Sequence, residues 1–145
     1  MSVDDTEKFA AWDKFLKAGS TVLKTLEREM EDDQHFPLNW YDVLVWLNQA
    51  PGGRMRMQSL ADSIYLSNSG LTRRLNRMAE AGLVERESCE EDRRGWYAVI
   101  TPKGREVVEK VSPGLETGIR SHFLNYLNDR DIQDLSRIMD KIIGR

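Results

Sequence analysis

Small and apolar residues recur at alternating intervals of three and four along residues 5–33, the first long periodic stretch of the chain. They are Phe9, Trp12, Leu16, Gly19, Leu23, Leu26 and Met30. This spacing predicts a long helix with one narrow apolar stripe, of the kind that coiled coils bury, on an otherwise polar surface. The helix is predicted to end before Pro37, because a proline disfavours a helical conformation in the residue that precedes it.

Three short elements are predicted between residues 38 and 64. Asn39 is placed to cap a helix, which the Pro-Gly-Gly sequence at residues 51–53 stops. Residues 54–57 alternate between polar and apolar side chains and indicate a short strand. Residues 59–64 are then predicted to form one or two turns of helix.

The next helix, predicted over residues 68–81 with Ser67 as its N-cap, has two chemically different faces. Its buried face consists of Leu71, Leu75, Met78 and Ala79. Its opposite face carries hydrogen-bonding side chains, namely Ser69, Thr72, Arg73, Asn76 and Arg77. A helix that packs on its own domain while presenting such donors suits the major groove of DNA. Gly82 follows where a left-handed C-terminal cap is expected.

Residues 83–89 and 96–101 have the composition of strands, and the charged segment between them predicts an antiparallel pair with a charged tip. Thr101 and Pro102 then restart a helix, as its N-cap and its first helical residue. We expect a kink or break in this helix at residues 112–114, which read Ser-Pro-Gly.

The chain is predicted to end in a helix that Asn128 caps. Its apolar stripe consists of Ile132, Leu135, Met139 and Ile142. Like the stripe of the first helix, it requires a partner surface.

A chain of 145 residues is expected to form a single domain with its own hydrophobic core. Its one cysteine, Cys89, excludes a disulfide within the chain and a multi-cysteine zinc site. No apolar run approaches the roughly 20 residues that cross a bilayer, and the acidic start MSVDDTEKF lacks the order of a secretory signal. We therefore expect a cytoplasmic protein with no membrane partner.

The net charge of −3 hides an asymmetry that matters for nucleic-acid binding. Residues 54–105 contain ten Lys and Arg against seven Asp and Glu, so this region carries +3 and the rest of the chain −6. Because salt screens charges beyond a Debye length of about 10 Å, contacts to phosphates depend on the local charge. The acidic ends of the chain therefore do not argue against DNA binding.

Two stretches of the chain resemble the MarR family (multiple antibiotic resistance regulators). One is the helix-turn-helix SLADSIYLSNSGLTRRLNRMAEAGLVER, and the other is the run DRRGWYAVITPKGREVV. The second is similar to the family pattern of Asp, any residue, Arg, then an apolar strand that ends in Leu-Thr, with a Gly three residues later. Asp92, Arg94, Thr101 and Gly104 fit this pattern, and Ile100 replaces the leucine.

The resemblance implies a mainly α (α+β) fold, a winged helix-turn-helix with N- and C-terminal dimerisation helices, that spans residues 1–145 as a single domain. Residues 1–34 and 113–145 then form the dimerisation helices, and residues 37–104 the DNA-binding core. The apolar stripes of the first and last helices agree with a homodimer, because one small domain offers too little surface to bury both. The expected dimer contacts are Phe9, Trp12, Leu16, Leu23, Ile119, Phe123, Leu135, Met139 and Ile142.

The resemblance also implies a sequence-specific regulator of transcription, most often a repressor, that binds double-stranded DNA without a cofactor. A two-fold dimer places its recognition helices about 34–36 Å apart, so we expect a pseudo-palindromic operator with half-sites roughly 10 base pairs apart. The expected DNA-binding residues are Ser67, Asn68, Ser69, Thr72, Arg73, Arg74, Arg77, Arg93 and Arg94.

The chemistry of these side chains suggests their roles. Arginine can bond bidentately to guanine and hydroxyl groups can reach bases or phosphates, which assigns Arg73 and Arg77 to the major groove. Arg94, with Arg93 as a further candidate, is expected to enter the minor groove, and Asp92 to hold Arg94 in place. Arg74 lies at the edge of the buried face, either as a phosphate contact or in a structural ion pair. A solvated helix face and a plain charged hairpin are the alternative interpretations.

Members of the family often bind small aromatic or phenolic effectors where the dimerisation helices meet the DNA-binding core. Trp40 and Trp46 lie near this junction in the sequence, but packing in the core is the simpler interpretation of both, so no pocket residue is assigned. Cys89 is expected to be a passive thiol, because the carboxylates of Glu87 and Glu90 beside it disfavour the thiolate.

Two other classes of function are open to this sequence. A winged-helix protein-interaction module without DNA binding has no reason to carry arginines at the groove-facing positions 73, 77 and 94. An enzyme with a cysteine nucleophile would need a histidine base, and neither His35 nor His122 belongs to a catalytic motif. The two histidines are also too few and too scattered for a metal site.

Overall fold

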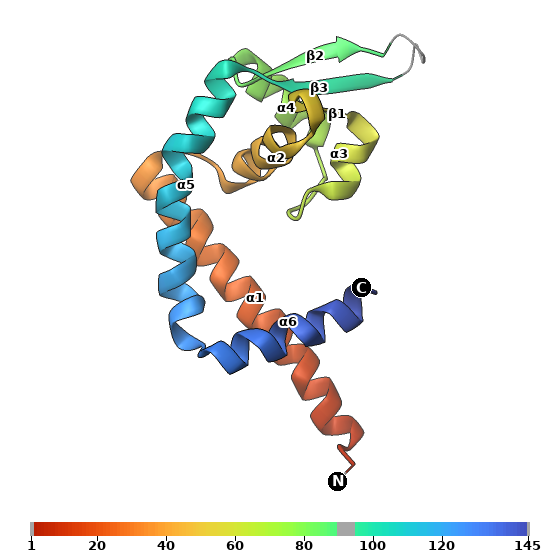
Figure 1. The fold of residues 1–145 in the computed structure, drawn as a ribbon, viewed down its shortest axis with the longest axis vertical. Helices are drawn as coiled ribbons and strands as arrows, with labels where there is room; N and C mark the ends of the chain where they lie inside the picture. The colour runs from red at the N-terminus through yellow and green to blue at the C-terminus, as the bar shows by residue number, and fades with distance from the viewer. Residues whose placement is uncertain (1, 90–94, 145) are drawn as a thin grey trace. The chain divides into compact units, whose positions relative to one another are not determined.

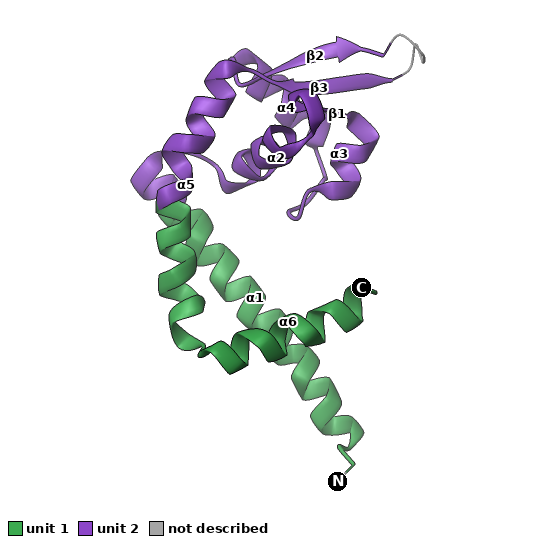
Figure 2. Cartoon of the chain, in the orientation of Figure 1, with its two compact units in different colours: residues 1–29, 114–145 green, residues 30–113 purple. Residues whose placement is uncertain are grey.

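The structure, a computed structural model, describes residues 2–89 and 95–144 (Figure 1). The chain divides into two compact units, which Figure 2 shows in different colours. We call residues 1–29 and 114–145 the arm unit and residues 30–113 the central unit. Helices α1 and α5 each contribute residues to both.

The described residues form a mainly helical structure with one small sheet, which confirms the predicted fold class. The helices are α1 (Asp5–Gln34), α2 (Leu38–Gln49), α3 (Met57–Ser63), α4 (Leu71–Glu80), α5 (Pro102–His122) and α6 (Asp129–Ile143), with short 3-10 turns η1 (Pro51–Gly53) and η2 (Leu124–Tyr126). The strands are β1 (Arg54–Arg56), β2 (Val84–Ser88) and β3 (Trp96–Ile100), in the order β1-β3-β2 and antiparallel throughout (Figure 1).

The core of the central unit lies between one face of this sheet and the helices α2, α3 and α4. Ala98 is at the centre of the register, paired with Met55 on one side and Arg86 on the other, and is 1% exposed. The fully buried larger side chains come from α2, α3 and α4, namely Val43, Leu44, Leu47, Leu60, Leu75 and Met78. Burying one such side chain contributes roughly 1.5–3 kcal/mol, so this cluster sets the positions of the three helices on the sheet.

The C-terminus of α4 is closed by the glycine cap that the sequence predicts. Gly82 has a φ of 78°, and its N–H donates to the carbonyl of Ala79 at 2.9 Å. The N–H of Leu83 donates to the carbonyl of Met78 at 3.0 Å, which completes a Schellman motif. Because Leu83 and Met78 are both buried, this cap also directs the chain into β2.

The Thr-Pro start of α5 is likewise confirmed, and it explains the glycine three residues after the threonine. The Oγ1 of Thr101 donates to the carbonyl of Gly82 at 2.6 Å and accepts from the N–H of Gly104 at 3.0 Å. A Cβ on Gly104 would lie 2.4 Å from the carbonyl oxygen of Leu83. Residue 104 therefore has to be glycine, since the start of α5 packs directly on the backbone that leaves α4.

The predicted cap of α2 is wrong, and the interruption predicted in α5 is not a break. The helix α2 begins at Leu38 with Pro37 in the N-cap position and no side-chain cap, so Asn39 lies inside the helix instead of capping it. Helix α5 runs through Pro113 without a break. The hydroxyl of Ser112 donates to the carbonyl of Val108 at 2.6 Å and pairs with the hydroxyl of Tyr41 at 2.7 Å, contacts that hold the helix just before the proline.

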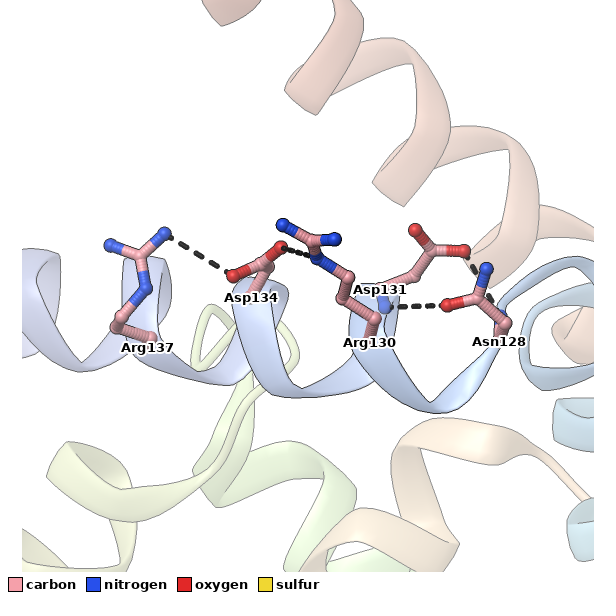
Figure 3. Close-up of polar contacts among 5 residues, drawn as sticks. All are labelled: Asn128, Arg130, Asp131, Asp134 and Arg137. Carbon is pink, nitrogen blue, oxygen red and sulfur yellow. Dashed lines mark hydrogen bonds and ion pairs between the residues drawn. The ribbon is translucent and has the colours of Figure 1, made fainter.

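In the arm unit, α6 begins with the cap that the sequence predicts, strengthened into a capping box (Figure 3). The side chain of Asn128 accepts from the N–H of Asp131 at 2.9 Å, and the carboxylate of Asp131 accepts from the N–H of Asn128 at 3.0 Å. The carboxylate of Asp134 lies between two arginines on the same helix. Its Oδ2 is 4.0 Å from the Nε of Arg130, and its Oδ1 is 3.5 Å from the Nη2 of Arg137. Such exposed pairs contribute little, so the capping box is the stronger local determinant.

Helices α1 and α5 approach each other closely within the arm unit. Gly118 is buried, and a Cβ there would lie 2.8 Å from the side chain of Leu26. One turn further, the Nε2 of His122 is 2.6 Å from the Oε1 of Glu29. None of the helices in the part of the chain that the structure describes is long and apolar enough to cross a membrane.

We predict that Asn128→Ala lowers the free energy of unfolding by about 1 kcal/mol, because it removes one half of the capping box. Gln133→Ala, at an exposed position within the same helix, is the control and should change the stability by less than about 0.5 kcal/mol. Denaturant unfolding followed by circular dichroism measures both. Equal stabilities of the two variants would show that the capping box contributes nothing.

Candidate nucleic-acid interface

Helix α4 separates its buried and exposed residues as the sequence predicts. Leu71, Leu75 and Met78 are at most 6% exposed and belong to the core of the central unit. The exposed side chains are Thr72, Arg73, Asn76 and Arg77. Two guanidinium groups and two shorter polar side chains therefore share a face whose position the core fixes.

The start of α4 differs from the prediction. The helix begins at Leu71, and its N-cap residue Gly70 has a left-handed φ of 70°. Ser67 does not cap it; its hydroxyl accepts from the N–H of Ser69 at 3.2 Å, while the side-chain amide of Asn68 donates to the carbonyl of Ala61 at 3.2 Å. These short polar side chains satisfy local backbone groups and form a turn where the pattern suggested the first turn of a helix.

Arg74 lies inside this turn and not on the exposed face. The residue is 8% exposed, and its Nη2 donates to the carbonyl of Ser67 at 2.7 Å and to that of Ser69 at 3.5 Å. Its Nη1 is buried and has no hydrogen-bond partner among the described residues. Burial lowers the pKa of the Arg74 guanidinium, and the negative charge of Asp42 opposes that shift. Of the two roles open to Arg74, this geometry favours the structural one.

Asp42 is a residue that the sequence reasoning missed. It is 8% exposed on α2, and its Oδ2 accepts from the N–H of Leu66 at 2.8 Å, in the turn that follows α3. Asp42 and Arg74 therefore both bond to the backbone of the turn between α3 and α4, at the adjacent residues Leu66 and Ser67. The signal was a single carboxylate within the otherwise apolar run WYDVLVWL, since charged residues are almost never fully buried unless they are paired.

The other candidate element is the wing, which we define as β2, β3 and the segment between them. The predicted minor-groove residues Arg93 and Arg94 and their support Asp92 lie outside the described residues. At the end of β2, Cys89 is 4% exposed, and its N–H donates to the carbonyl of Gly95 at 3.1 Å. Trp96, the first residue of β3, is 46% exposed.

No cluster of three or more histidine, cysteine or acidic side chains arranged for a metal ion occurs among residues 2–89 and 95–144.

Within the arm unit, the predicted dimer contacts include several exposed apolar side chains. Phe9 is 71%, Trp12 55% and Ile142 73% exposed. Ile119, Phe123, Leu135 and Met139 are half-buried.

These features define the class of protein. A helix-turn-helix whose second helix exposes arginines, followed by a two-stranded wing, is the arrangement of winged helix-turn-helix regulators of transcription. A model of the MarR family matches residues 36–95, which hold the helix-turn-helix and β2. The chain belongs to the MarR family.

Solved structures share the fold along nearly the whole chain. AbsC, a MarR family transcriptional regulator from Streptomyces coelicolor, is 35% identical with a TM-score of 0.85, over 99% of this chain and 96% of that one. Sco3205, a MarR family regulator from the same organism, was solved in complex with DNA; it is 28% identical with a TM-score of 0.86, over 99% and 89% of the two chains. BpsR from Bordetella bronchiseptica, whose DNA binding is regulated by 6-hydroxynicotinic acid, shares the fold at 17% identity and a TM-score of 0.78, over 100% and 99%.

We predict that Arg74→Met lowers the free energy of unfolding by about 1.5–3 kcal/mol, because it removes charge-assisted hydrogen bonds inside the turn. Arg73→Met is the matched control, since the neighbouring arginine is exposed on the same helix and should change stability by less than about 0.5 kcal/mol. Thermal or urea unfolding distinguishes the two. Equal losses would rule out a structural role specific to Arg74.

Proposed function

We propose that this protein is a dimeric transcriptional repressor that binds a pseudo-palindromic operator through α4 and the wing, and that a small aromatic effector modulates this binding. The observation that carries the proposal is the division of α4, in which buried apolar residues anchor the helix while Arg73 and Arg77 remain exposed. The similarity to Sco3205, a relative solved in complex with DNA, supports it.

The exposed residues of α4 have the chemistry that direct readout requires. Arg73 and Arg77 are one helical turn apart and can each donate two hydrogen bonds to a guanine or bind a phosphate. The hydroxyl of Thr72 reaches bases or phosphates from the same face. Ser67, Asn68 and Ser69 are exposed in the turn before α4, where their polar groups suit the DNA backbone. The assignment of Arg93 and Arg94 to the minor groove rests on the sequence alone.

The dimer is proposed from the apolar surface of the arm unit. Phe9, Trp12 and Leu16 follow one stripe of α1 and are each at least 47% exposed. On α6, Ile138 and Ile142 are 42% and 73% exposed. Large apolar side chains that gather in this way mark an interaction surface, and a second copy of the chain would bury them in a two-fold arrangement. Two copies would then present two α4 helices to one DNA duplex.

We predict that Arg77→Ala weakens operator binding by about tenfold to a hundredfold, because a bidentate arginine–guanine contact is worth about 1–3 kcal/mol of discrimination. An electrophoretic mobility shift with the intergenic DNA upstream of the chain's own gene measures it. Arg130→Ala is the control, since that side chain is 90% exposed on α6. Unchanged affinity of Arg77→Ala across several salt concentrations would refute the assignment of Arg77 to the interface.

We predict that hydroxyl-radical footprinting of the bound operator shows two protected half-sites roughly 10 base pairs apart, centre to centre. Analytical ultracentrifugation of the free protein should show a dimer. A footprint over a single half-site, made by a monomer, would contradict both the dimer and the pseudo-palindromic operator. A protein that binds no DNA from its own promoter region would favour the protein-interaction module.

A further inference from the structure

Residues 64–70 join α3 to α4, and we call them the α4 turn (Figure 1). The exposed residues of this turn include Ser67, Asn68, Ser69 and Gly70. A Cβ on Gly70 would meet nothing within 4 Å, so open space lies against the backbone at this point. The turn therefore presents an accessible stretch of backbone directly before the helix that the proposed function assigns to DNA.

Arg74 approaches the same turn from inside the central unit. Its Nη2 donates to the carbonyl of Ser67 at 2.7 Å and, at the longer distance of 3.5 Å, to that of Ser69. The residue is 8% exposed, and its Nη1 is buried with no hydrogen-bond partner among the described residues. A buried guanidinium with an unused nitrogen is costly, so the filling of space does not explain it; an apolar side chain would do that at lower cost.

The two carbonyls that Arg74 holds determine where the N–H groups of the same peptides point. A trans peptide is planar, and its C=O and N–H bonds point in opposite directions. The described residues contain no cis peptide bond. Since the carbonyls of Ser67 and Ser69 point toward Arg74, the N–H groups of Asn68 and Gly70 point away from it. Two backbone donors are thus directed toward the exposed side of the turn.

The other polar groups of the α4 turn leave these two donors available. The N–H of Ser69, which lies between them, donates to the hydroxyl of Ser67 at 3.2 Å. The side-chain amide of Asn68 donates to the carbonyl of Ala61 at 3.2 Å, which ties the turn to α3. Neither the N–H of Asn68 nor that of Gly70 has a hydrogen-bond partner within the part of the chain that the structure describes.

We infer that Arg74 is a positioning residue for DNA binding, which directs the N–H groups of Asn68 and Gly70 at one phosphate of the DNA backbone. Converging backbone N–H groups are a common site for phosphates. The N-terminus of α4, which begins at Leu71, adds the positive end of the helix dipole. Asp42 carries the opposite charge near Arg74, so this pair acts through the orientation of the backbone and not through net charge. The inference rests on the proposed DNA binding and assigns one of its contacts.

Mobility shifts of the full chain with operator DNA and with a scrambled duplex of the same length test the inference. We expect Arg74→Met to weaken binding to both duplexes about tenfold, because the hydrogen bonds that it loses serve a phosphate, and phosphates carry no sequence information. Val108→Ala, a variant of the buried core on α5, is the control. It also lowers stability but should keep normal DNA affinity when all proteins are compared at a temperature at which each is folded.

Neutral methylphosphonate linkages, placed at one position of each half-site at a time, provide the decisive measurement. At one position, the linkage should weaken binding by the original protein but have a much smaller effect on Arg74→Met, because the variant no longer directs its donors at that phosphate. The same linkage should still weaken binding by Arg77→Ala, whose proposed contact is to a base. A merely structural role of Arg74 would lower the affinity without singling out one phosphate.

Arg74→Lys carries the same test if Arg74→Met does not fold. A lysine keeps the charge but lacks the planar fork of donors, so it holds the two carbonyls less well. Arg74→Lys should therefore be less sensitive than the original protein to the methylphosphonate at that position. Full sensitivity of both Arg74 variants, unchanged DNA affinity of Arg74→Met, or an equal loss of affinity in Val108→Ala would each overturn the inference.

The two duplexes also separate this inference from the proposed function. A loss confined to the operator would make Arg74 part of base readout and would overturn its role at a phosphate. If the original protein binds neither duplex, the proposed function fails as well. If Arg77→Ala weakens operator binding while Arg74→Met does not, only the role of Arg74 is refuted and the proposed function stands.

Discussion

The packing of the short helix α4 on the core is the interaction on which the rest of this structure depends. A helix of ten residues has little stability of its own, so its position comes from the side chains that it buries. Leu75 and Met78 provide this anchor at 1% exposure or less. The residues between them, Asn76 and Arg77, are held in the solvent by the same geometry, because 3.6 residues make one turn. Burial of the apolar face of α4 therefore positions the polar residues of its opposite face, which form the candidate interface.

The turn before α4 shows how buried charge contributes to this arrangement. Arg74 and Asp42 are both 8% exposed residues, and their side chains hydrogen-bond to the backbone at Ser67 and Leu66. Buried charged groups are costly unless they are paired and hydrogen-bonded, and one nitrogen of Arg74 has no hydrogen-bond partner among the residues that the structure describes. The side chains of Arg74 and Asp42 fix the path of the chain from α3 into α4. Two apolar side chains would not specify this path, because they could not hydrogen-bond to the backbone.

Several features that depend on neighbours within a few residues were predicted correctly from the sequence. The glycine cap at Gly82, the Thr101 start of α5 and the Asn128 cap of α6 all have the predicted geometry, since each is decided by local hydrogen bonds. The start of α4 was misplaced because two competing local signals exist there, and the left-handed Gly70 prevailed over Ser67. Pro113 does not break α5, and the hydroxyl of Ser112 holds the helix just before it through its contacts with Val108 and Tyr41.

The order of apolar and polar residues was enough to establish the elements, the exposed face of α4 and the family, because periodicity and motif spacing are properties of a linear chain. Tertiary structure alone decided which of two adjacent arginines is buried, since Arg73 and Arg74 differ only by 100° around the helix and the position of the core distinguishes them. It also decided that Trp46, Arg54 and Tyr97, from three different elements, line one groove. Contacts between distant segments have no local signal, because they are formed only when the whole core packs.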